Sequence, residues 1–365
     1  MIPKTWKEFR ETISDNAVRN NIPISGQFEL TARCNLRCKM CYVCRAANDQ
    51  AAISRELTAV EWINLAREAQ KAGMLYLLLT GGEVFIRPDF QEIYEEMLKL
   101  GLRITIYTNA TLITPEIAQW LGRFPPAAME VTIYGASEQT YQKVSGDPDG
   151  FSQTLRGIDL LAAQGINLKL RTTVISDNAA DHDQLVKLAE DRDLLLQYVL
   201  YISPRRGVLS GVKDSLRLSP QEITQYEIKA SQTFARIVSK MKEKYDLPPN
   251  ALVDQNKQKN NLVSPHYPFK CNAGRSAFWV TWFGAMTPCG TMAEPATEPL
   301  RAGFANAWKE LTALCAAIPL CSECSQCSVR EVCWTCPARL KSETGHFDRP
   351  ASYLCEWAKL RNIYF

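Results

Sequence analysis

Three cysteines stand close together near the start of the chain, Cys34, Cys38 and Cys41, with three and then two residues between them. They follow a short strand-like run at residues 28–31, so we expect them on a loop at the end of a strand. Three thiolates on one loop can hold three irons of a four-iron, four-sulfur cluster and leave the fourth iron open to a small chelating ligand. The alternatives are a zinc site, with Cys44 as its fourth thiolate, and a set of buried thiols without metal.

A second candidate site follows the apolar run at residues 75–80, which ends in Gly81, Gly82 and Glu83. Two glycines allow the backbone to approach a ligand closely, and the carboxylate of Glu83 can accept a cationic amine. A Gly-Gly turn after a strand is common by itself. Parallel strands, however, end at one edge of a sheet, so we expect Glu83 to lie near the cysteine loop.

Strands and helices alternate through the first half of the chain. The apolar runs predict strands at 28–31, 75–80, 103–108, 129–134, 167–175 and 195–202, and helical periodicity predicts helices at 58–72, 88–100, 115–121, 151–163 and 181–191. Six such units predict parallel strands with helices outside them. The fold class is therefore α/β, a partial (β/α)6 TIM-like barrel with its site at the carboxyl ends of the strands.

Four segments are expected. Residues 1–25 form an N-terminal lead-in, and residues 26–215 form the barrel. Residues 216–268 hold a long amphipathic helix at 220–245 and a polar connector at 248–268. Residues 269–365 form a small cysteine-rich domain.

The composition narrows the function classes. Hydrophobic residues make up 46% of the 365 residues and the net charge is +3, with no basic stripe of the kind that binds nucleic acid. No apolar run reaches membrane-spanning length and the N-terminus lacks a signal-peptide core, so we expect a cytoplasmic protein with no membrane partner. Cytoplasmic cysteines rarely form disulfides, and these thirteen gather at 34–44 and 271–355. This distribution favours metal sites.

The cysteine loop, Tyr42 after its third cysteine and the Gly81-Gly82-Glu83 turn together resemble the radical S-adenosylmethionine (SAM) superfamily over residues 26–202. The resemblance implies that SAM binds the open iron and is cleaved to a 5′-deoxyadenosyl radical. It implies that Tyr42 lies by the adenine, and that Glu83, Asn109 and Arg171 help to bind SAM. Thr108 and Asn109 stand where the superfamily often has the sequence Thr-Asn-Gly, and Ala110 takes the place of the glycine.

The C-terminal cysteines are similar to the SPASM extension of radical SAM enzymes that modify peptides and proteins. Twelve residues separate Cys271 from Gly284 and four separate Gly284 from Cys289, and a run of four cysteines and a last one follow. The resemblance implies a first auxiliary [4Fe–4S] cluster on Cys271, Cys289 and Cys336, and a second on Cys324, Cys327, Cys333 and Cys355. The first is one ligand short, so either one iron is open or Cys321, Cys315 or a non-cysteine ligand completes it. Two structural zinc sites are the alternative.

The resemblance predicts three [4Fe–4S] clusters and a maturase that forms a thioether or carbon-carbon crosslink in a ribosomally made peptide. An electron donor such as flavodoxin or ferredoxin is the expected partner. The segment before Cys34 is too short for a leader-binding domain, so the leader is expected to bind the barrel, the linker or a separate protein. Alternatives are a peptide epimerase with Cys44, Cys315 or Cys321 as hydrogen donor, an anaerobic sulfatase-maturing enzyme, and an electron-transfer protein without a substrate.

Overall fold

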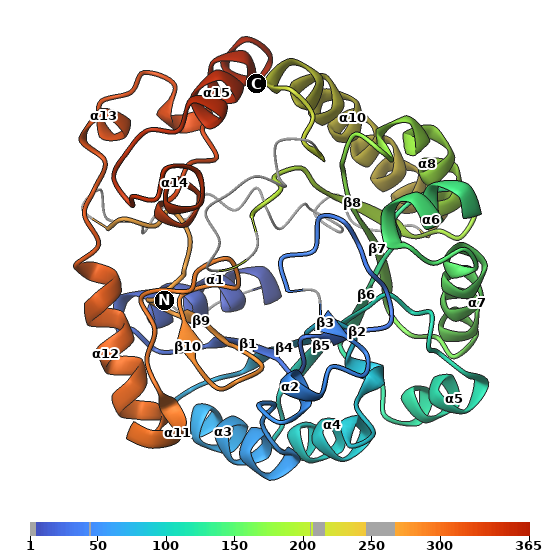
Figure 1. The fold of residues 1–365 in the computed structure, drawn as a ribbon, viewed down its shortest axis with the longest axis horizontal. Helices are drawn as coiled ribbons and strands as arrows, with labels where there is room; N and C mark the ends of the chain where they lie inside the picture. The colour runs from blue at the N-terminus through green and yellow to red at the C-terminus, as the bar shows by residue number, and fades with distance from the viewer. Residues whose placement is uncertain (1–4, 44, 205, 207–215, 246–266) are drawn as a thin grey trace.

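The computed structural model describes residues 5–43, 45–204, 206, 216–245 and 267–365. Its centre is a sheet of eight strands in the order β10-β9-β1-β4-β5-β6-β7-β8, ringed by helices (Figure 1). Neighbouring strands from β9 to β8 are parallel, and β10 is antiparallel to β9. The strands are β1 (Ser25–Glu29), β4 (Tyr76–Thr80), β5 (Arg103–Thr108), β6 (Ala128–Thr132), β7 (Leu168–Thr173), β8 (Leu195–Val199), β9 (Ala277–Val280) and β10 (Met286–Thr287). The predicted partial barrel is confirmed, and all six predicted strands are present.

The predicted helices also form, and most follow the strands around the outside of the barrel (Figure 1). They are α3 (Ala59–Lys71), α4 (Phe90–Lys99), α5 (Pro115–Arg123), α7 (Gly150–Ala163), α8 (His182–Glu190) and α10 (Pro220–Lys244). Two of them begin with a capping box, Thr58 with Glu61 in α3 and Ser219 with Glu222 in α10. Sequence reasoning missed α6 (Glu138–Ser145), whose short and mostly polar sequence buries Tyr141 and Val144.

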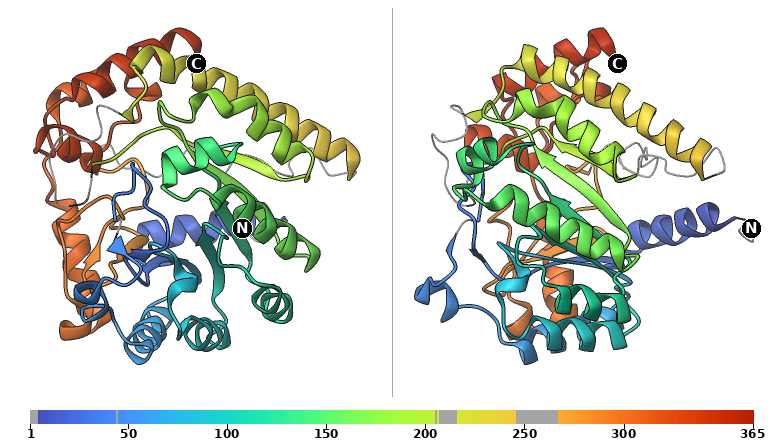
Figure 2. Two further views of the ribbon diagram at one scale, coloured as in Figure 1. Left: turned by 45° about the vertical axis from the view of Figure 1, so that its right-hand side comes forward. Right: turned by 90° about the vertical axis from the view of Figure 1, so that its right-hand side faces the viewer.

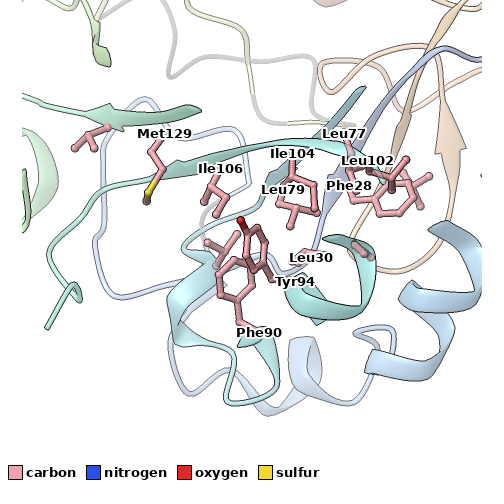
Figure 3. Packing of buried hydrophobic residues seen from close by; sticks show 14 of the residues in the cluster. Phe28, Leu30, Leu77, Leu79, Phe90, Tyr94, Leu102, Ile104, Ile106 and Met129 are labelled. Carbon is pink, nitrogen blue, oxygen red and sulfur yellow. The ribbon is translucent and has the colours of Figure 1, made fainter. Parts of the chain in front are cut away.

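The core lies between the sheet and these helices, where alternate strand residues point outward. Figure 3 shows the packed side chains of Phe28, Leu77, Leu79, Ile104, Ile106 and Met129 with Phe90 and Tyr94 of α4. The intervening residues of each strand point into the barrel, because side chains alternate along a strand. These inward positions include charged residues, among them Glu29, Glu130 and Arg171.

The C-terminal region shares the barrel's sheet. Strand β9 pairs with β1, so that Gln27 lies between Trp279 and Leu78. The region continues with the helices α11 (Pro299–Ala302), α12 (Phe304–Ala316), α13 (Ser322–Ser325), α14 (Pro337–Thr344) and α15 (Ser352–Tyr364). Helix α15 packs beside α10, as both views in Figure 2 show. The segment boundaries expected from the sequence remain predictions.

At the other end of the chain, α1 (Trp6–Arg19) projects away from the barrel (Figure 2). The connector at 248–268 lies outside the described residues except for its last two, and Cys44 also lies outside them. In the part of the chain that the structure describes, no helix has both the length and the apolar character needed to cross a membrane.

Candidate active site

The three-cysteine loop begins directly beyond the carboxyl end of β1. The short parallel pair β2 (Arg33–Cys34) and β3 (Arg45–Ala46) closes the base of the loop. Cys34 and Cys38 are buried, and Cys41 packs against them together with Met40 and Tyr134. The structure therefore brings the three predicted cluster ligands into one contact group. Thiolate is the donor that iron–sulfur clusters use, so this donor set fits a cluster with one open iron.

A buried ionic network fixes the base of this loop. The guanidinium of Arg33 donates two hydrogen bonds to Glu56, at 2.8 and 2.9 Å. Arg87 donates to the Leu30 carbonyl at 2.9 Å and to the Leu57 carbonyl at 3.0 Å. Because these groups are buried, losing one partner would leave an uncompensated charge beside the loop. The network thus holds the residues on both sides of β1's end in one arrangement.

Gly81 and Gly82 are required by a close approach of the chain to itself. A Cβ on Gly82 would lie 2.6 Å from the Arg33 carbonyl carbon and 2.8 Å from the Ala32 oxygen. The backbone N–H of Gly82 donates to the Thr31 carbonyl at 2.7 Å, and that of Glu83 donates to the Arg33 carbonyl at 2.9 Å. The glycines therefore join the end of β4 to the backbone that leads into Cys34. The sequence had suggested a close approach to a ligand instead.

Glu83 lies at the bottom of this junction and is 1% exposed. Its carboxylate accepts hydrogen bonds from the Asn109 N–H at 2.7 Å, the Thr108 hydroxyl at 2.8 Å and the Phe85 N–H at 3.2 Å. Burial raises the pKa of Glu83 to about 7, and these hydrogen bonds oppose the shift. Glu83 thus ties the end of β4 to the end of β5. Because burial disfavours the ionised form of Glu83, a nearby cation would stabilise its carboxylate.

Asn109 connects the end of β5 to the first cysteine. Its side-chain amide donates to the Asn35 side chain at 3.0 Å and approaches the Cys34 sulfur at 3.7 Å. The next residue, Ala110, has a φ of +58°. That left-handed backbone favours glycine, the residue that the Thr-Asn-Gly pattern of the resemblance has at this position.

Tyr42 is close to a residue that sequence reasoning missed, Arg206. The guanidinium of Arg206 lies over the Tyr42 ring, 5.4 Å from its centre. It donates to both oxygens of the buried Glu29, at 3.0 and 2.6 Å, and to the Gly290 carbonyl at 2.9 and 2.7 Å. The indole N–H of Trp279 also donates to Glu29, at 3.2 Å. Arg206 therefore links the end of β1, the three-cysteine loop and Gly290, the residue after Cys289.

Tyr134 is a second residue that the sequence did not reveal. It follows β6 and hydrogen-bonds the Cys38 thiol, and burial raises its pKa well above the ordinary range for tyrosine. A hydrogen bond to a cluster sulfur is one of the factors that set a cluster's reduction potential. The sequence feature that could have identified Tyr134 was its position at the end of the strand predicted at 129–134.

Arg171 points into the barrel from β7. It donates to the Tyr107 hydroxyl at 2.7 Å and to Gln197 at 3.4 Å, and it forms an ion pair with Glu130. Its Nε has no hydrogen-bond partner among the described residues. A guanidinium with an unused N–H can donate a hydrogen bond to a carboxylate. Its contact with SAM remains a prediction.

A first group of thiols forms at the junction of the barrel and the C-terminal region. We define the first thiol group as Cys271, Cys289, Cys315 and Cys336. Cys271 is exposed as a residue, yet the protein around its sulfur desolvates the thiolate and, together with the neighbouring thiols of Cys336 and Cys289, raises its pKa to about 12. Burial raises the pKa of Cys315 to about 12 as well, with Cys289 and Cys271 contributing. Metal binding must displace these protons, which couples loading to pH.

The second thiol group consists of Cys321, Cys324, Cys327, Cys333 and Cys355. These cysteines line a cavity of 220 Å³, which also touches Cys336 and the cations Lys270, Arg330 and Lys359. In a four-iron cluster each thiolate binds a different iron, so its sulfurs stand farther apart than those around one zinc ion. Within the described residues, no three His, Cys, Asp or Glu side chains are arranged to hold a single metal ion.

A buried ion pair holds this region against the barrel. Arg217 donates to Glu343 of α14 at 3.1 and 2.5 Å, and the Tyr201 hydroxyl donates to the same carboxylate at 2.7 Å. The guanidinium also lies over the rings of Tyr201 and Tyr353, 4.9 and 4.7 Å from their centres. The segment after β8 is therefore fixed relative to the helices that carry the second thiol group.

Comparisons with known proteins agree with this geometry. The family model described as "Radical SAM superfamily" matches residues 28–189. The AdoMet-dependent heme synthase of Methanosarcina barkeri (strain Fusaro / DSM 804) is 28% identical over 345 residues, which are 90% of this chain and 95% of that protein. The structure of Streptococcus suis SuiB bound to the precursor peptide SuiA has a TM-score of 0.67 at 14% identity, over 97% of this chain and 82% of SuiB. AdoMet-bound anSMEcpe with the Cp18Cys peptide has a TM-score of 0.69 at 16% identity, over 93% of this chain and 96% of that one.

Proposed function

Because this chain belongs to the radical SAM superfamily and is of the SPASM type, we propose that it is a maturase that oxidises a ribosomally made peptide and forms a thioether or carbon-carbon crosslink. The single observation that carries this proposal is the pair of C-terminal thiol groups beside the barrel. Nine cysteines there supply enough ligands for two auxiliary clusters in addition to the cluster that binds SAM. In a net oxidation the substrate radical must give up one further electron, and an auxiliary cluster can accept it.

We assign the residues at the carboxyl ends of the first barrel strands to the SAM cluster and to SAM. When bound, SAM with its cluster supplies a 5′-deoxyadenosyl radical that takes one substrate hydrogen, and the auxiliary clusters supply an acceptor for the electron that remains. Cys34, Cys38 and Cys41 hold the SAM cluster, and Tyr42 lies by the adenine. Glu83 accepts the amino group of SAM in a buried position where a cation lowers its cost of ionisation.

Arg206 contacts residues beside both proposed cluster sites. Its guanidinium spans from the Tyr42 ring to the Gly290 carbonyl, next to Cys289. It also neutralises Glu29, which is fully buried in the barrel wall. We therefore propose that the substrate binds near Arg206, which contacts both cluster loops.

The substrate class rests on the fold neighbours. The folds of SuiB and anSMEcpe match this chain over 97% and 93% of its length, and their structures hold a precursor peptide and a Cp18Cys peptide, respectively. A crosslink removes two hydrogens from the peptide. Epimerisation removes and returns one hydrogen, and the sulfatase-maturing alternative oxidises one side chain to an aldehyde. The electron donor, which we propose is flavodoxin or ferredoxin, supplies the electron for SAM cleavage in each case.

A second candidate is oxidation of a porphyrin side chain. The observation that favours it is the match with the Methanosarcina barkeri heme synthase, which spans nearly the full length of both proteins. Porphyrin precursors of heme carry carboxylates, and Arg171 and Lys169 on β7 face the barrel interior. Arg171 also has an unused donor.

One experiment separates these reactions. The anaerobically reconstituted protein is incubated with SAM and a reductant, once with short peptides encoded next to its gene and once with iron coproporphyrin III. Crosslinking predicts a peptide lighter by two hydrogens, and porphyrin oxidation predicts loss of carbon dioxide and two hydrogens from the porphyrin. A peptide of unchanged mass that gains one deuterium in deuterated water would instead establish epimerisation. Mass change in neither substrate, with 5′-deoxyadenosine formed, would refute both proposals.

A further inference from the structure

We infer that Cys315 is the fourth cysteine ligand of the first auxiliary cluster, so that all four irons of that cluster are bound by the chain. The inference rests on the proposed auxiliary clusters and assigns the ligand that the sequence pattern leaves missing. It concerns the first thiol group, in which Cys271, Cys289 and Cys336 are the ligands expected from the SPASM resemblance.

Cys315 is held in one place by α12. It is fully buried on the face of that helix that also buries Phe304, Ala307, Trp308 and Leu311. Its side chain turns toward the segment after Cys271, because a Cβ on Gly274 would lie 2.5 Å from the Cys315 sulfur. Gly274 has a φ of +69°, so glycine is favoured there both by the backbone and by the sulfur beside it.

The turn that follows Cys271 carries that cysteine toward α12. The N–H groups of Arg275 and Ser276 donate to the Asn272 carbonyl at 3.0 Å, and Gly274 donates to Ala277 at 2.9 Å. The guanidinium of Arg275 donates back to the Cys271 carbonyl at 3.3 Å. Cys271 and Gly274 therefore belong to one tight turn, and the sulfur of Cys315 lies against this turn at Gly274.

The two other expected ligands come from two further segments of the C-terminal region. Cys289 follows β10, and Cys336 is the residue before α14. Both pack against the same hydrophobic cluster that contains Cys315 and Ala273. The Gly274 contact joins Cys315 to the turn of Cys271, and the thiols of Cys289 and Cys336 are neighbours of Cys271, so four separate segments contribute thiols to the first thiol group.

Cys321, another unassigned thiol that the structure describes, belongs elsewhere. Its sulfur accepts a hydrogen bond from the Cys324 N–H at 3.4 Å and caps α13. It lines the cavity of the second thiol group. Cys321 is therefore a suitable control for Cys315, since both are buried cysteines in the C-terminal region.

Full ligation changes the expected role of the first auxiliary cluster. With four protein thiolates no iron is left for a substrate thiolate, so the cluster exchanges electrons with the substrate without binding it. The sequence pattern allowed an open iron that could bind a substrate thiolate. With Cys315 as the fourth ligand, the first auxiliary cluster has no such iron.

The test uses the full-length protein with Cys34, Cys38 and Cys41 changed to Ala, so that only the auxiliary clusters contribute. Electron paramagnetic resonance spectra of the reduced protein are recorded with and without cyanide, which binds an iron that lacks a protein ligand. We expect no spectral change on adding cyanide to this parent. A Cys315→Ala change in it should produce a new cyanide-dependent signal, and a Cys321→Ala change should not.

A cyanide-dependent signal in the parent itself would overturn the inference, and this result requires no folded Cys315 variant. A Cys315→Ala spectrum identical to that of the parent with and without cyanide would overturn it as well. The peptide reaction does not enter these measurements, so failure of the proposed substrate would leave the ligand assignment standing.

Discussion

Replacing Gly82 by Ala should disrupt the junction on which the SAM-cluster loop depends. The new methyl group would lie 2.6 Å from the Arg33 carbonyl carbon, so the backbone before Cys34 must move. Overpacking of this kind costs about 1–3 kcal/mol. The hydrogen bonds from Gly82 and Glu83 to the Thr31 and Arg33 carbonyls would be lost too, at about 1 kcal/mol each. We therefore expect unfolding free energy to fall by about 4 kcal/mol in total.

Gly101 provides the matched control. It has a φ of +74°, and no heavy atom lies within 4 Å of the place that an alanine methyl group would take, so Gly101→Ala should cost only the backbone strain of about 1–2 kcal/mol. Urea unfolding of the metal-free proteins measures both effects, and iron analysis after reconstitution shows whether the SAM cluster still forms. If Gly82→Ala costs no more than Gly101→Ala and keeps its full iron content, the junction does not position the loop as described.

Two further changes test buried charges. Burial raises the pKa of Glu83 to about 7 from an ordinary 4.5, so the folded state binds the proton more tightly and the metal-free protein should lose about 3 kcal/mol of stability as pH rises through that window. Glu83→Gln should abolish this slope in unfolding midpoints, and an unchanged slope would assign the titration elsewhere. Arg206→Gln leaves Glu29 buried without its cation and should destabilise the protein by about 3–5 kcal/mol. Adding Glu29→Gln should recover much of that loss, and a double variant as unstable as the single one would contradict the pairing.

The sequence predicted the parts of this molecule that depend on local patterns. Strands such as β5 and helices such as α3 follow from apolar periodicity, and the structure adds a capping box at Thr58 to the start of α3. The cysteine loop and the Gly81-Gly82-Glu83 turn could be placed together because parallel strands end at one edge. The roles of the two glycines could not be predicted, because their close contact is with the chain's own backbone.

Contacts between distant segments were not predictable in the same way. Arg206 and Glu29 are 177 residues apart, and neither belongs to a recognisable motif. Strand β9 joins the barrel beside β1, which joins the cysteine-rich region to the barrel's sheet. The division of the spare thiols, Cys315 with the first group and Cys321 with the second, likewise depends on how α12 and α13 pack.

The most direct test of the three-cluster arrangement is the iron, sulfide and zinc content of the anaerobically reconstituted protein. Three four-iron clusters predict about twelve irons and about twelve sulfides per chain, with no zinc. Changing Cys34, Cys38 and Cys41 to Ala should lower the count to about eight and abolish 5′-deoxyadenosine formation. About four irons in the unaltered protein, with zinc bound in the C-terminal region, would contradict the account.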